Sequence, residues 1–110
     1  TENDVNYLVN KISGLRIFRD ENDKMNLSIK DINGSVLVIS QFTLCGNTKK
    51  GRRPSFINAA PPEDGNRLYE YFMTEIEKES VPVESGEFGA DMKVELVNDG
   101  PVTFVLNSKD

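Results

Sequence analysis

The sequence predicts an α/β domain, because two segments with helical periodicity are separated by several short apolar runs that are typical of strands. The chain has 110 residues, which suits one domain with a modest core. Hydrophobic residues make up 37% and charged residues 28%, and no low-complexity tract interrupts them, as is typical of a folded globular protein. We therefore expect a single domain over residues 1–110.

Two helices are indicated by capping residues and by apolar side chains that recur on one side. The first is predicted to be capped by Asn3 or Asp4 and to end at Gly14. The second is predicted to begin at Pro61 and Pro62. Its apolar stripe consists of Leu68, Tyr69, Phe72, Met73 and Ile76. We interpret this stripe as part of the core.

Short strands are predicted between and after the helices. The candidate runs are 15–18, 26–29, 35–42, 91–98 and 102–107, of which 35–42 is the strongest. Residues 81–90 lead into the last two of these strands. Residues 43–62 are too irregular for a helix and form a long connection, which indicates a functional loop.

Several classes of site are excluded by composition. The chain has no histidine, so a Ser-His-Asp triad, a Cys-His pair and a His-containing zinc site are excluded. Its one cysteine, Cys45, excludes thiolate clusters and fits a reducing compartment. No run is long and apolar enough to span a membrane, and no signal peptide is recognisable. We expect a cytoplasmic protein with no metal, no cofactor and no membrane partner.

Two local features permit both a structural and a functional interpretation. Ser40, Gln41 and Thr43 end the strongest strand, where they either satisfy backbone groups or line a site. Residues 49–53, KKGRR, form either a solvated turn or a local anion site on a chain whose net charge is −5. Residues 99–101, Asp-Gly-Pro, are on local grounds a hairpin turn, although the proline leads directly into a predicted strand.

Five stretches, in this order and spacing, resemble the D-aminoacyl-tRNA deacylase family: SQFTL (40–44), KKGRRPSF (49–56), AAPPE (59–63), FGADM (88–92) and VNDGPVT (97–103). The resemblance extends from about residue 5 to residue 108. It implies a mixed, barrel-like sheet with two helices packed outside it. It also implies a homodimer that, without a metal, hydrolyses the ester of D-aminoacyl-tRNA and of glycyl-tRNA mischarged on non-cognate tRNA. Family members usually begin with additional strands, so we expect an N-terminally short domain with an incomplete sheet.

The resemblance also implies the site. The implied catalytic residues are Ser40, Gln41, Phe42 and Thr43. Backbone N–H groups around Gln41 and Phe42 would bind the oxyanion. Because no histidine activates Thr43, we favour hydrolysis assisted by the 2′-OH of the substrate over a Thr43 nucleophile. Gly100-Pro101 would be a cis dipeptide inserted into the partner subunit's site, where it excludes L side chains.

The remaining implied contacts concern tRNA. The implied phosphate contacts are Lys49, Lys50, Arg52 and Arg53. Phe42 and Phe56 either wall the terminal adenosine or belong to the core. Two other functions are weighed against the deacylase: a non-catalytic RNA-binding domain, and a dimeric structural module. Neither explains why SQFT and GPVT occur in one chain.

Overall fold

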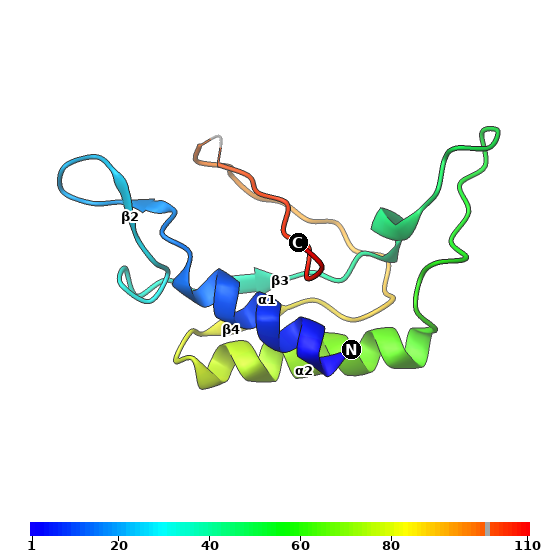
Figure 1. Cartoon of the computed structure of the whole chain (residues 1–110), viewed down its shortest axis with the longest axis horizontal. Helices are drawn as coiled ribbons and strands as arrows, with labels where there is room; N and C mark the ends of the chain where they lie inside the picture. The colour runs from blue at the N-terminus through cyan, green and yellow to red at the C-terminus, as the bar shows by residue number, and fades with distance from the viewer. Residues whose placement is uncertain (101) are drawn as a thin grey trace.

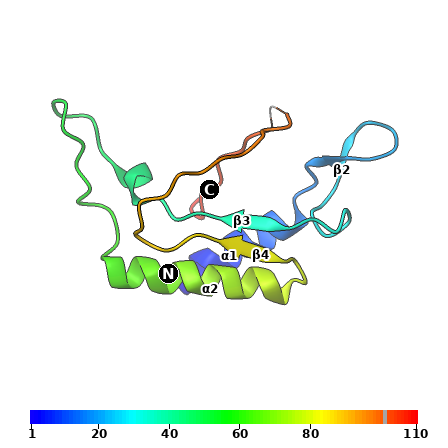
Figure 2. The same ribbon diagram turned by 180° about the vertical axis from the view of Figure 1, so that it is seen from behind.

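The computed structural model describes residues 1–100 and 102–110. In chain order its elements are α1 (Glu2–Gly14), β1 (Phe18–Arg19), β2 (Met25–Leu27), β3 (Val36–Val38), the 3₁₀ helix η1 (Phe42–Cys45), α2 (Pro62–Lys78) and β4 (Val83–Ser85). Figures 1 and 2 show α1, α2 and the β3–β4 pair gathered on one side of the molecule, while long loops and the β1–β2 hairpin project from it. The predicted mixture of two helices with short strands is confirmed.

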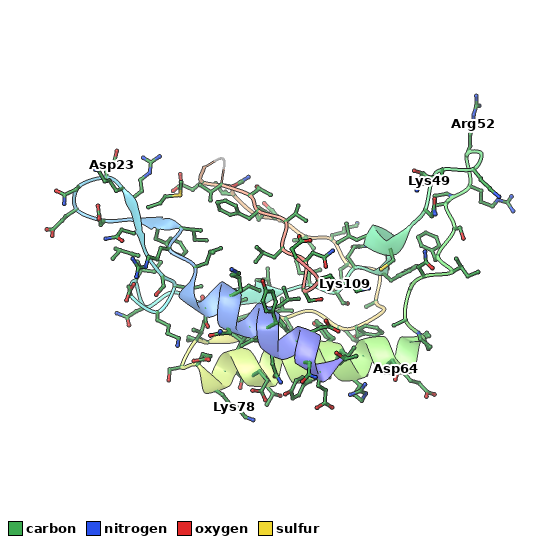
Figure 3. The ribbon with its side chains drawn as sticks, viewed as in Figure 1. Asp23, Lys49, Arg52, Asp64, Lys78 and Lys109 are labelled. Atoms are coloured by element: carbon green, nitrogen blue, oxygen red, sulfur yellow. The ribbon has the colours of Figure 1, made fainter. Side chains whose placement is uncertain are left out.

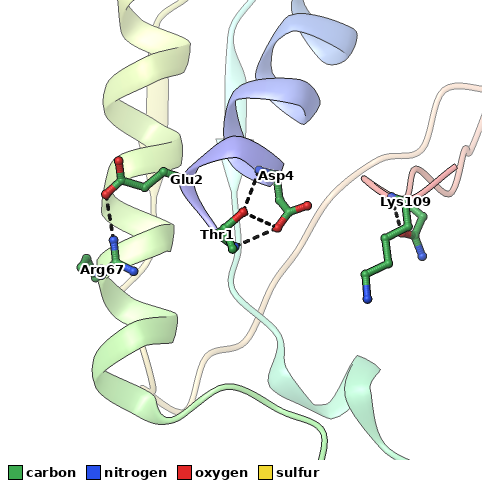
Figure 4. A network of polar contacts seen from close by, with 6 residues as sticks. Thr1, Glu2, Asp4, Arg67 and Lys109 are labelled. Atoms are coloured by element: carbon green, nitrogen blue, oxygen red, sulfur yellow. Dashed lines mark hydrogen bonds and ion pairs between the residues drawn. The ribbon is translucent and has the colours of Figure 1, made fainter.

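The first helix begins earlier than predicted. Thr1 is its N-cap, and the Thr1 hydroxyl accepts a hydrogen bond from the Asp4 N–H at 3.3 Å. The Asp4 carboxylate in turn accepts from the terminal ammonium at 2.8 Å and from the Thr1 hydroxyl at 2.7 Å (Figure 4). These bonds hold the pKa of Asp4 well below its usual range. The predicted cap at Asn3 or Asp4 is wrong, because Asp4 lies in the first turn as the second half of a capping box.

The second helix has the predicted start, with Pro62 in its first turn. Two members of its predicted apolar stripe, Tyr69 and Ile76, are buried, and Leu68 and Phe72 pack against the core, which supports the interpretation of the stripe. Within the residues that the structure describes, neither helix combines the length and apolar character needed to cross a bilayer.

The core lies where the two helices meet the β3–β4 pair. Its buried apolar side chains are Val5, Val9, Ile76 and Val81. Polar contacts also join the helices, because Arg67 on α2 pairs with Glu2 on α1 at 3.0 Å (Figure 4). The Tyr71 hydroxyl donates to the Asn6 side-chain oxygen at 2.7 Å. The helices and β4 therefore form a scaffold from which the chain enters its loops.

The strands form two separate sheets. β1 and β2 pair antiparallel, whereas β3 and β4 pair parallel from Val36↔Val83 to Val38↔Ser85. Neither sheet closes in the described part of the chain, so the barrel-like arrangement stays a prediction. The strand predicted over 35–42 is short because β4 supplies partners for three residues only, after which the chain turns into η1.

The strands predicted at 91–98 and 102–107 are wrong for this structure. No ladder is assigned to the described residues of these two runs. Their alternating apolar residues suit a strand, but a strand also needs a neighbour to pair its backbone groups. Val97 and Val105 are each 93% exposed, so no other element covers this segment. The alternating pattern predicted segments that could pair as strands, but the described residues of these segments pair with no other strand in the single chain.

Candidate active site

The segment that carries the SQFT motif lies where the chain leaves β3. Ser40 is half-buried, and Gln41 forms the extended N-cap of η1 with φ −151° and ψ 94°. Phe42 and Thr43 open η1, and the Thr43 carbonyl accepts from the Gly46 N–H at 3.0 Å. Gln41, Phe42 and Thr43 are all exposed. The predicted catalytic residues therefore lie together on the surface, on a 3₁₀ turn in place of the predicted strand.

The side chains of Gln41 and Thr43 contact one another. The Gln41 amide nitrogen donates a hydrogen bond to the Thr43 hydroxyl oxygen. A side-chain amide has no basic lone pair with which to remove a hydroxyl proton, so this contact orients Thr43 without activating it. The role of the Thr43 hydroxyl in the reaction stays a prediction.

Two aromatic rings meet beside this turn. The Phe42 and Phe56 rings form an edge-to-face pair with centroids 5.1 Å apart and planes at 63°. Phe42 is 62% exposed and Phe56 is 37% exposed, so neither ring belongs to the core of the isolated chain. The pair forms an exposed apolar surface directly beside Gln41 and Thr43.

Gly46 allows this close arrangement, and sequence reasoning did not identify it. A Cβ at Gly46 would lie 3.0 Å from Cε1 of Phe56 and 3.0 Å from the Thr43 carbonyl oxygen. Both contacts are tighter than ordinary van der Waals approach, so a side chain here would push the Phe56 ring away from η1. The available signal was a glycine shortly after a strand end, which often marks a close backbone approach.

The KKGRR loop begins four residues after η1. An antiparallel bridge between Asn47 and Ser55 closes the base of the loop, with N···O distances of 2.7 and 2.9 Å. Gly51, at φ +66°, supplies the left-handed turn that reverses the chain. Figure 3 shows Lys49 and Arg52 on the outer part of the loop, away from the helices. The exposed cations are Lys49, Lys50, Arg52 and Arg53, and no ion pair found among the described residues includes them.

The other predicted motif lies elsewhere. Gly100 is exposed, and Pro101 lies outside the described residues, so the predicted cis Gly100-Pro101 bond stays a prediction. Figures 1 and 2 show the segments 91–98 and 102–107, which flank this motif, running away from η1 toward the opposite side of the molecule.

The candidate site is an open surface in the single chain. Two surface cavities of about 380 Å³ each lie away from the SQFT segment. One is lined by residues between Glu77 and Val83, and the other by residues between Tyr7 and Arg16. Neither cavity includes Ser40, Gln41, Phe42 or Thr43.

Comparison with known proteins assigns the family. The sequence profile described as D-Tyr-tRNA(Tyr) deacylase matches residues 1–107. A D-aminoacyl-tRNA deacylase from Geobacter sulfurreducens is 57% identical over 109 residues, which cover 99% of this chain and 72% of that protein. Another from Pseudoalteromonas translucida is 64% identical over 99 residues, which cover 90% of this chain and 68% of that protein.

A solved structure agrees in fold. The c-Myc DNA Unwinding Element Binding Protein is 37% identical and superposes with a TM-score of 0.82, covering 93% of this chain and 70% of that chain. The residues that the family profile matches, 1–107, include the SQFT turn, the KKGRR loop and the two helices. The chain belongs to the D-Tyr-tRNA(Tyr) deacylase family and is therefore a hydrolase.

Proposed function

We propose that the chain hydrolyses the ester between a D-amino acid and the 3′ end of tRNA, and that it also removes glycine from mischarged tRNA. The names of its relatives give the substrate class. The observation that carries the proposal is the exposed SQFT turn, which lies at the base of a loop with four unpaired cations among the described residues. When the ester lies at the turn, the neighbouring tRNA phosphates are close enough to be attracted by the positive charges of the loop.

The cationic loop suits the nucleic-acid part of this substrate. Its four cations neutralise phosphates near the 3′ end, although the whole chain carries a net charge of −5. The Asn47–Ser55 bridge keeps the loop attached at a fixed point beside η1. The Phe42–Phe56 pair supplies an aromatic surface for the terminal adenine, since bases stack on aromatic rings with little regard to sequence.

The SQFT turn acts mainly by positioning and by stabilising charge. Gln41 is the N-cap of η1 and Phe42 is its first residue, so their N–H groups have no partner within the 3₁₀ helix and are available to an oxyanion. Water adds to the ester carbonyl carbon, the bond to the 3′ oxygen breaks, and that oxygen leaves with a proton. The substrate 2′-OH assists by accepting a hydrogen bond from the attacking water.

Selection against L-aminoacyl esters is assigned to a second copy of the chain. Gly100-Pro101 of one subunit forms a rigid wall beside the α-carbon of the ester that the other subunit binds, which admits a hydrogen or a D side chain. The segments 91–98 and 102–107, which run away from η1 within one chain, support an arrangement between subunits. The exposed apolar residues in them offer a surface for the second copy. We place this homodimer in the cytoplasm, in line with its single cysteine.

The first test measures release of labelled amino acid from D-Tyr-tRNA, L-Tyr-tRNA and Gly-tRNA. The D and glycyl esters are expected to be hydrolysed and the L ester to be spared. Phe42→Pro removes both the ring and the N–H, whereas Phe42→Ala removes the ring alone. Loss of an oxyanion donor costs about 10²–10³ in kcat, so Phe42→Pro is expected to fall that far below Phe42→Ala.

Thr43→Ala tests the role of the hydroxyl, with Thr74→Ala as the matched control on α2, where the hydroxyl only bonds to the Glu70 carbonyl. Thr43→Ala is expected to slow hydrolysis by about tenfold through lost positioning. A loss as large as that of the whole catalytic effect would show that Thr43 is the nucleophile after all.

Mixing two impaired variants tests the wall. Phe42→Pro and Pro101→Ala subunits, each weakly active or unselective alone, are expected to recover about a quarter of the selective activity when mixed, because half of random dimers then hold one intact site. Absence of recovery would place the two motifs in one subunit. Salt-dependent tRNA binding without any turnover would favour an RNA-binding domain, and dimerisation without tRNA affinity would favour a structural module.

A further inference from the structure

A buried hydroxyl on α2 contacts both strands of the parallel pair at the point where they end. Tyr69 is 9% exposed, and its hydroxyl lies 3.4 Å from the Val38 carbonyl oxygen and 3.3 Å from the Gly86 carbonyl oxygen. Val38 is the last residue of β3, and Gly86 directly follows β4. A tyrosine hydroxyl carries one proton, so it is shared between the two carbonyl groups.

The Tyr69 ring is held firmly from the other side. It packs against Phe88 with centroids 5.7 Å apart and planes at 44°. Phe88 in turn lies against α2 at Gly65, where a Cβ would approach its ring to 3.2 Å. Burial and the contact with Phe88 restrict the ring, so the position of the hydroxyl is set by α2 together with Phe88.

The hydroxyl contacts the ladder at its end. The Val38↔Ser85 pair is the last of the backbone pairing between β3 and β4. At this pair, the Tyr69 hydroxyl adds a donor from α2 to the Val38 carbonyl. This contact restricts the direction in which β3 leaves the sheet, two residues before the SQFT turn.

We propose that Tyr69 is a positioning residue for the reaction, because its hydroxyl holds the end of β3 so that residues 40–43 leave the sheet in the productive direction. This inference rests on the catalytic role proposed above for the SQFT turn. Tyr69 touches no reacting atom, and its effect passes through the Val38 carbonyl. A displacement of the oxyanion donors by a fraction of an ångström lowers the rate of hydrolysis. It leaves the affinity for tRNA unchanged, because that affinity is proposed to come from the cations of the KKGRR loop.

The test compares Tyr69→Phe with Tyr71→Phe in the full chain. Both changes remove one hydroxyl from α2 and keep the ring, but the Tyr71 hydroxyl bonds to Asn6 on α1. Tyr69→Phe is expected to lower kcat for D-Tyr-tRNA by about tenfold with KM nearly unchanged. Amide hydrogen exchange in a peptide spanning residues 39–46 is expected to rise several-fold. Tyr71→Phe is expected to change neither quantity, although it removes a bond between the helices.

The outcomes separate this inference from the proposed function. Unchanged exchange at 39–46 in Tyr69→Phe overturns the positioning role whatever the activity, and so does raised exchange with an unchanged kcat. If Phe42→Pro lowers kcat relative to Phe42→Ala while Tyr69→Phe does not, the catalytic turn stands and the role of Tyr69 fails. If neither variant lowers kcat, the role proposed for the turn fails as well, and Tyr69 has nothing to position.

Discussion

The molecule divides into a packed half and an open half. The packed half consists of α1, α2, β3 and β4, where Val9 is 4% exposed and Ile76 is 1% exposed. The open half consists of the loops after β3 and β4, residues 39–60, 86–100 and 102–107, where Leu44 is 85% exposed and Val105 is 93% exposed. Apolar side chains occur in both halves. What differs is whether a second element of the same chain lies over them.

This difference assigns separate tasks to the two halves. The packed half contains the buried core and the pairing that fixes β3, whereas the described residues that are proposed to meet the substrate lie in the open half. Loops that carry chemistry are commonly held by a rigid scaffold in this way. The open half exposes many large apolar side chains, and such surfaces commonly mark contacts with another protein. This surface suits the second copy of the chain proposed above.

The largest expected effect separates the halves by stability. Ile76→Ala leaves a cavity in the packed half and is expected to lower the free energy of unfolding by about 2–5 kcal/mol. Ile57→Ala makes the same change at a side chain that is 85% exposed in the open half, and is expected to cost under about 0.5 kcal/mol. Urea unfolding followed by circular dichroism measures both. Equal losses would mean that the open half is packed in solution.

A second prediction concerns what covers the open half. If a second copy covers it, the free energy of unfolding rises by about 1.4 kcal/mol for each tenfold increase in protein concentration. Phe104→Asp, at a ring 54% exposed, is expected to abolish this dependence. Met25→Asp is the matched control, because Met25 is 56% exposed on the projecting β1–β2 hairpin. If the dependence on protein concentration were the same in both variants, the open half would not be the surface that contacts the second copy.

A third, smaller effect concerns the cationic loop of the open half. The double variant Arg52→Ala with Arg53→Ala is expected to reduce the slope of log affinity for tRNA against log salt by about 1.5, as two lost phosphate contacts require. Arg16→Ala with Arg19→Ala removes the same charge near β1 and is expected to leave the slope nearly unchanged. Equal changes in the two double variants would assign the effect to net charge alone. Filter binding over a range of salt concentrations measures it.

The two helices of the packed half were predictable from the sequence, because their signals are local. The 3.6-residue spacing of Val5, Val9 and the α2 stripe sets which side of each helix is buried. The open half was not, since pairing depends on a neighbour that local sequence does not specify. Alternation at 91–98 predicted a strand that the described residues do not form, and β3 ended where β4 stopped supplying partners.

The site shows the same limit. The motif resemblance pointed to Ser40–Thr43 and the KKGRR loop, and the structure places both on one continuous segment after β3. It gave no indication that Gly46 makes room for Phe56, or that the Tyr69 hydroxyl reaches across to Val38. These contacts join residues 10 and 31 positions apart, so they follow from how the elements pack and not from any local pattern.

The smallest expected effect uses acid to compare a turn beside the core with a turn outside it. The Asp31 carboxylate accepts from the Ser28 N–H at 2.8 Å, and this bond lowers the pKa of Asp31 below its ordinary value of 3.8. The Asp20 carboxylate accepts from the Lys24 and Asn22 N–H groups, and its pKa is lowered in the same way. Both carboxyls bind protons more weakly folded than unfolded, so their stabilisation is complete above pH 3.8 and is lost as the pH falls through the lowered value.

Asp31→Asn and Asp20→Asn should therefore differ, although both remove a carboxylate that caps a turn. The Asp31 turn carries Ile29, which packs against the core, so Asp31→Asn is expected to lower global stability near pH 7 and to approach the parent chain as the pH falls through the lowered pKa of Asp31. The Asp20 turn lies on the projecting hairpin, which opens locally at little cost to the rest, so Asp20→Asn is expected to leave global stability unchanged across this range. Urea midpoints measured at several pH values decide the matter. A pH-dependent loss in Asp20→Asn as large as that in Asp31→Asn would show that the hairpin unfolds together with the packed half.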